Sequence, residues 1–112
     1  MTETQIKFVK DCIRTNDMHR FYTWSSWLNV RTKVLDIDKN ECQDCKEKGL
    51  YTKATTVHHV NHVRKYPELA LEIFYSKSGQ QERNLVSLCH ECHEKRHGRL
   101  YDNISALTPE RW

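Results

Sequence analysis

The sequence predicts a small α+β fold in which helices come first and a metal-stapled core of two short strands and a helix follows. Three observations lead to this fold. Apolar residues recur at helical spacing in the first third of the chain, and two short runs typical of strands stand in its second half. Four cysteines form two C-x-x-C pairs, Cys42/Cys45 and Cys89/Cys92. The 112 residues are enough for a single domain, which we expect over residues 1–112.

An N-terminal helical part is predicted over about residues 2–37. Thr2 and Gln5 have the spacing of a capping box at the start of a helix expected over residues 2–14. After a break, a second helix is predicted from residue 21 or 25 to about residue 37. Apolar side chains repeat at helical spacing there, and we interpret the two tryptophans as core or interface anchors; the residues are Trp24, Trp27, Leu28, Val34 and Leu35.

The stapled core is expected over about residues 40–98. In chain order we predict a strand at 55–60, a short helix at 67–75, a loop at 76–82, a strand at 85–88 and a helix from about 89 through His97 to Gly98. The final residues, 99–112, are weakly patterned and are expected to form a C-terminal tail.

The four paired cysteines predict a structural Zn²⁺ site. Two C-x-x-C knuckles supply the four thiolates of a closed tetrahedral centre. The ion would clamp the turn before the first strand to the start of the last helix. Two pairs without a thioredoxin-like pattern argue against a redox role. No signal peptide or membrane-spanning run is visible, so we expect a reducing cytoplasm, no membrane partner and metal-bound cysteines.

Four histidines and an asparagine are interleaved with the cysteines. His58 and His59 are adjacent on the first predicted strand, Asn84 precedes the second, and His93 and His97 share a face of the last helix because they are four residues apart. Imidazoles of this kind suit an open metal site that acts on a substrate. In a regular strand His58 and His59 point to opposite faces, so a shared site would require the strand to leave ideal geometry near them.

These motifs resemble the HNH endonuclease family over about residues 40–98. The family pattern is a knuckle, a strand ending in D-H or H-H, an Asn before a second strand, and C-x-x-C-H leading into a further His. The stretch RFYTWSSWLNVRTKVL also resembles small phage-encoded members. The resemblance implies the ββα-metal fold and a metal-dependent DNA endonuclease that hydrolyses phosphodiester bonds by nicking or double-strand cutting. For a bacteriophage protein the site of action would be the host cytoplasm.

The resemblance also implies a role for each motif residue. His59 resembles the general base that activates the attacking water, and His58 and His93 resemble ligands of the catalytic divalent ion. His97 resembles a further ligand or a phosphate contact. Asn84 resembles the residue that orients the loop and the base, although a turn cap before the strand is a competing interpretation. Cys42, Cys45, Cys89 and Cys92 resemble the structural zinc ligands.

The ligand set departs from many members, which have Asp where this chain has His58. Colicin-type members do have His-His there. The nitrogen-rich set favours transition metals over magnesium, with Mn²⁺, Ni²⁺, Zn²⁺ and Mg²⁺ as the candidate ions. The implied partner is DNA, and because phage HNH proteins often act with a terminase, a terminase is a further implied partner in DNA packaging.

One alternative from a different class stays open. The formal net charge of +3 is compatible with nucleic acid but does not require an enzyme. The chain could be a non-catalytic zinc-binding module that binds nucleic acid. His59 discriminates between the two, because such a module has no need of a non-ligand histidine beside a His ligand.

Overall fold

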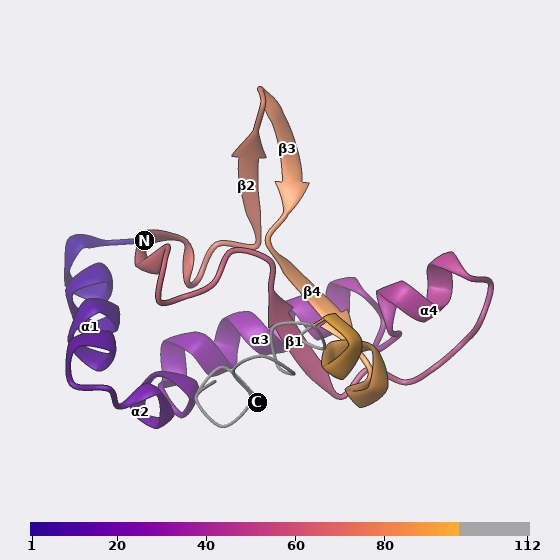
Figure 1. Ribbon diagram of the computed structural model, residues 1–112, viewed down its shortest axis with the longest axis horizontal. Coiled ribbons are helices and arrows are strands. Elements are labelled where there is room, and N and C mark those ends of the chain that lie inside the picture. Colours follow the sequence, from indigo (N-terminus) through magenta and orange to yellow (C-terminus); the bar gives the residue numbers. More distant parts are fainter. Residues whose placement is uncertain (97–112) are drawn as a thin grey trace.

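The computed structural model describes residues 1–96 and places helices around a two-stranded antiparallel sheet (Figure 1). In chain order the elements are α1 (Glu3–Arg14), α2 (Met18–Tyr22), α3 (Ser25–Ile37), α4 (Gln43–Glu47), β1 (Thr56–His59), the 3-10 helix η1 (Pro67–Leu69), β2 (Phe74–Lys77), β3 (Gln80–Arg83) and β4 (Leu85–Leu88). Residues 90–96 are helical. His97, Gly98 and the expected tail at 99–112 lie outside the described residues.

The helices α1 and α3 form as the sequence predicted. The Thr2 hydroxyl accepts the Gln5 N–H at 3.1 Å and the Gln5 side chain accepts the Thr2 N–H at 2.9 Å, which confirms the capping box. The break after α1 is confirmed by a positive φ of 55° at Asn16. The short helix α2 was not predicted, although Asp17 caps it by accepting the Arg20 N–H.

The sheet that positions the candidate site pairs β1 with β4. His58 lies opposite Val86 and His59 opposite Leu85, so the pairing is regular to the end of β1. Because side chains alternate along a strand, the two faces carry different environments. One face packs on α3, and the other faces the cysteines and residues 90–96.

Two buried clusters correspond to these two faces. The larger cluster joins the N-terminal helices to the sheet through side chains that include Phe21, Trp27, Val34, Val57 and Leu85. Trp27 is 2% exposed, which confirms it as a core anchor, and Trp24 is partly buried against the same cluster. The second cluster consists of the four paired cysteines with Val86 and Leu88.

In the segment between η1 and Asn84 the structure differs from two of the predictions. Only Pro67–Leu69 is helical, as a 3-10 turn, and the region expected to be a loop is a hairpin of β2 and β3 that projects from the body (Figure 1). Its turn residues Ser78 and Gly79 both have positive φ, 52° and 80°, as a tight two-residue hairpin turn requires. A hairpin forms here instead of a helix and a loop, because Phe74 and Tyr75 have a high propensity for strands and the Ser-Gly pair fits this turn.

The base of the hairpin is fixed to the rest of the fold. The Arg83 guanidinium donates to both carboxylate oxygens of Asp38, at 3.0 and 2.8 Å, and Asp38 also accepts the Ser87 N–H at 3.1 Å. Asp38 is the residue after α3, so this partly buried ion pair joins that helix to β3 and β4. None of the helices among the described residues has the length and apolar character needed to cross a bilayer.

Candidate metal centres and active site

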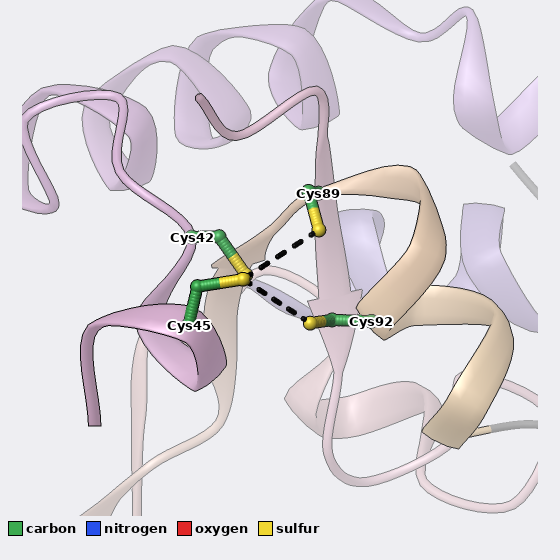
Figure 2. Close-up of side chains that lie close together, drawn as sticks. All are labelled: Cys42, Cys45, Cys89 and Cys92. Atoms are coloured by element: carbon green, nitrogen blue, oxygen red, sulfur yellow. Dashed lines mark hydrogen bonds between the residues drawn. The ribbon is translucent and has the colours of Figure 1, made fainter. Parts of the chain in front are cut away.

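The four paired cysteines converge on one point (Figure 2). Cys42 precedes α4 and Cys45 lies within it, while Cys89 follows β4 and Cys92 lies in the helix of residues 90–96. The Cys45 Sγ is 4.0 Å from the Cys89 Sγ and 3.6 Å from the Cys92 Sγ. Four sulfurs bound tetrahedrally to zinc at about 2.3 Å lie about 3.8 Å apart. The cluster is therefore positioned to bind a metal ion, and its donor set fits zinc.

The pKa values of two of these thiols, Cys42 and Cys92, are shifted because the four sulfurs are buried close together. Burial raises the pKa of Cys42, but backbone N–H groups of Cys45 and Cys89 and the neighbouring thiols donate to its sulfur and lower that pKa to about 7. Burial and the adjacent sulfurs raise the pKa of Cys92. A bound metal cation would stabilise all four cysteines as thiolates.

An ion pair next to the cysteine cluster joins the two C-x-x-C segments. The Arg96 guanidinium donates to both carboxylate oxygens of Asp44, at 2.8 and 2.7 Å. Arg96 holds the pKa of Asp44 below its ordinary value, outweighing the effect of burial. The pair joins α4 to the helix of residues 90–96, so it supports the geometry that the cysteines need.

His58 and His93 are brought together on the cysteine-facing side of the sheet. Both are buried, at 7% and 4% exposure, and their ring centroids are 5.4 Å apart with planes inclined at 72°. Two imidazoles bound to one ion at about 2.0–2.1 Å place their centroids about 5 Å apart at a tetrahedral angle. The pair therefore has a spacing that fits two ligands of one transition metal ion. His97 lies outside the described residues.

His59 lies on the opposite face of β1 from His58. Its ring stacks on Trp27 with a centroid distance of 4.7 Å and an inclination of 27°, and the residue is 0% exposed. The Nε2–H donates to the carbonyl oxygen of Ala70 at 2.9 Å. Since a carbonyl only accepts, Nε2 carries the hydrogen and the lone pair of the neutral ring is on Nδ1. The strand keeps ideal geometry here, so the structure does not bring His59 together with His58 and His93.

Asn84 clamps the loop that holds His59. Its Oδ1 accepts the backbone N–H and the side-chain amide of Asn61, at 3.1 and 2.8 Å, and its Nδ2 donates to the carbonyls of Leu69 and Glu72, at 2.9 and 2.8 Å. Those carbonyls bracket Ala70, the partner of His59. Asn61 was not singled out from the sequence; its position two residues after the His-His pair was the available signal.

The comparisons with known proteins agree with this architecture. The chain is similar to the crystal structure of the HNH endonuclease of the deep-sea thermophilic bacteriophage GVE2 with manganese ion, at a TM-score of 0.64 and 23% identity. The match covers 92% of this chain and 97% of that one, and it confirms the predicted α+β fold. A comparison with curated proteins found no match.

The family assignment comes from a separate comparison. The family model described as HNH endonuclease matches residues 42–99, a segment that contains both cysteine knuckles, His58, His59, Asn84 and His93. This segment is just over half of the chain. The chain therefore belongs to the HNH endonuclease family.

Proposed function

We propose that the chain is a divalent-metal-dependent endonuclease that hydrolyses phosphodiester bonds of DNA. The observation that carries the proposal is the pair of buried imidazoles, His58 on β1 and His93 on the following helix, 5.4 Å apart inside the segment that matches the family. Two facing imidazoles suit a transition metal ion better than Mg²⁺, so Mn²⁺, Ni²⁺ or Zn²⁺ is the expected ion. A separate zinc ion on the four cysteines would be structural.

The ligands and the ion have one proposed task. His58, His93 and, as the resemblance implies, His97 would hold the divalent ion. When bound, the ion would act as a Lewis acid that stabilises negative charge on the scissile phosphate and the leaving oxygen.

The proton of the attacking water is assigned to His59. A neutral imidazole can accept that proton, and the acceptor here would be Nδ1, because Nε2–H is donated to Ala70. Asn84 holds the carbonyls on either side of Ala70, so it fixes the acceptor that orients the His59 ring. In this assignment Asn84 orients both the loop and the base.

One observation favours a second candidate function. His59 is 0% exposed and its ring is stacked on a core tryptophan, an environment that also suits a purely structural histidine. The alternative is a non-catalytic zinc module that binds nucleic acid. A role beside a terminase in phage DNA packaging would be compatible with either function and is supported by the family resemblance alone.

The test is cleavage of supercoiled plasmid by zinc-loaded protein over titrations of Mn²⁺, Ni²⁺, Mg²⁺ and Zn²⁺. His59→Ala is expected to keep its zinc, its fold and its DNA affinity but to lose about 10²–10⁴-fold in cleavage rate, the usual contribution of a general base. His93→Ala should cut weakly and recover in part at high metal concentration. The ends produced should be 5′-phosphate and 3′-hydroxyl, as the resemblance implies.

The matched control is His90→Ala, which removes a histidine from the same helix as His93. The His90 side chain is 78% exposed, so this variant should cleave like the wild type. Wild-type cleavage by His59→Ala would refute the assignment of the base. Absence of cleavage by the wild-type protein with all four metals would favour the binding-module alternative.

A further inference from the structure

Three aromatic rings from the N-terminal helices lie next to the imidazole ring of His59. Phe21 and Tyr22 of α2 approach its ring with centroid distances of 6.0 and 6.5 Å and inclinations of 55° and 64°. Trp27 of α3 is closer, at 4.7 Å and 27°. Of these three rings only Trp27 is stacked on the imidazole, and it in turn packs on Phe21 at 5.5 Å.

Two independent contacts therefore fix the orientation of the imidazole. The hydrogen bond from Nε2–H to Ala70 lies at one edge of the ring and determines which nitrogen carries the hydrogen. The indole of Trp27 covers a face of the ring and determines its plane. The hydrogen bond constrains the Nε2 edge of the ring, and the stack constrains the plane of the ring.

We propose that Trp27 is a positioning residue for hydrolysis, which stacks on His59 so that the ring keeps the plane and the tautomer that the structure gives it. The inference deepens the proposed function and rests on His59 being the general base. It gives Trp27 a task in the reaction and connects α3 to the proposed active site.

The expected effect is on the rate of the chemical step rather than on DNA binding. Misplacing a reacting group by about 1 Å costs on the order of 10²-fold in rate. Trp27→Leu is expected to lower kcat by about 10- to 100-fold and to leave KM within about twofold. Trp27→Phe restores a flat ring and is expected to recover most of the loss.

Trp24→Leu is the matched control. Trp24 lies three residues earlier, is partly buried in the same cluster, and packs on Phe8 with a centroid distance of 4.4 Å instead of on His59. If Trp27 only fills the core, Trp24→Leu and Trp27→Leu should lower kcat equally once both are compared at temperatures equally far below their Tm.

Nuclear magnetic resonance of zinc-loaded protein with ¹⁵N-labelled histidine gives a readout independent of cleavage. In the wild-type protein His59 should be a single tautomer with hydrogen on Nε2, and its ring protons should be shifted upfield by the indole. Trp27→Leu should lose the upfield shift and show mixed tautomers, whereas Trp24→Leu should keep both signatures. A wild-type spectrum without these signatures overturns the proposal even if Trp27→Leu does not fold.

The outcomes separate this inference from the proposed function. Loss of the His59 signatures in Trp27→Leu without a larger fall in kcat than in Trp24→Leu would overturn the role of Trp27 in the reaction. Wild-type cleavage by His59→Ala would instead overturn the assignment of the base, and the inference with it. A selective fall in kcat with rescue by Trp27→Phe would support the proposal.

Discussion

His58 and His59 have the same side chain but lie in different environments, because neighbouring residues of a β-strand point to opposite faces of the sheet. His58 faces His93 beside the cysteines, and His59 faces Trp27 in the larger core cluster. For the proposed roles this separation keeps the His59 ring from binding the ion, and it requires the attacking water to reach a ring on the other face of the strand. A base must keep a lone pair free of the metal ion, and the strand directs the His59 ring away from the two proposed ligands.

Asn84 offers the sharpest test at the scale of one residue. Its amide uses two acceptor and two donor positions within the fold, and the residue is 0% exposed. Asn84→Asp keeps the shape but replaces both donors by acceptors that face the carbonyls of Leu69 and Glu72. Each unsatisfied buried carbonyl costs about 1–3 kcal/mol, so urea unfolding should show a large loss of stability.

The control for this prediction is Asn29→Asp, the same change at an exposed position of α3. It should change the free energy of unfolding by less than about 0.5 kcal/mol, as surface substitutions usually do. Equal stabilities of the two variants would show that the four hydrogen bonds of Asn84 do not hold the loop.

At the scale of elements, the sequence predicted what local signals specify. The capping box of Thr2 and the apolar spacing of Trp24 and Trp27 located α1 and α3, because caps and helical periodicity are properties of neighbouring residues. The β2–β3 hairpin was missed because the short stretch around Pro67 reads equally well as a helix start, and the Ser-Gly turn signal was weak.

In the candidate site, too, the sequence predicted what local spacing specifies and missed contacts between distant elements. The cysteine spacing fixed the four members of the cluster, and their convergence was confirmed. The contact of His59 with Trp27 and Ala70 could not be predicted, because it joins three elements whose packing no local pattern specifies. Alternation along the strand did anticipate that His58 and His59 would diverge.

The ion pair between Asp44 and Arg96 gives a prediction for the contact of two helices. Its atoms are partly exposed, so Asp44→Asn should lower the free energy of unfolding by only about 0.2–1 kcal/mol. Because the pKa of Asp44 is lowered from 3.8 in the folded state, this contribution is complete above about pH 4 and is lost as the pH falls through the lower folded value.

Thermal unfolding of zinc-saturated protein between pH 3 and pH 8 measures this contribution. The difference in Tm between the wild type and Asp44→Asn should be constant from pH 8 to pH 5 and should shrink below pH 4. Glu82→Gln, at an exposed position of β3, is the control and should unfold like the wild type. A Tm difference that grows on acidification would contradict the assigned sign.

At the scale of the whole molecule, the chain depends on two clusters of different kinds. The larger one is apolar and joins the N-terminal helices to one face of the sheet, while the smaller one consists mainly of cysteines. Cys45 and Cys89 are 44 positions apart, so an ion bound to both would close a loop that contains β1, the hairpin and β4. Such an ion would hold His58 and His93 in place without touching them.

Metal removal should therefore unfold the core. Structural zinc supplies about 10–16 kcal/mol in small peptides, which matches or exceeds the net stability of about 5–15 kcal/mol of an ordinary domain. We expect elemental analysis to find one tightly held zinc ion per chain. Chelation, or Cys42→Ser, should abolish the cooperative thermal transition seen by circular dichroism.

Cys12→Ala is the matched control, because Cys12 is buried in α1 within the apolar cluster and lies outside the group of four. It should keep one zinc ion per chain and lose only the stability expected from removing a buried sulfur. The two substitutions each delete one thiol, so a difference in zinc content between them isolates the ligand role from the packing role. A zinc-free protein that unfolds at the same temperature as the zinc-loaded protein would refute the structural role of the ion, because the loop from Cys45 to Cys89 would then be held by packing alone.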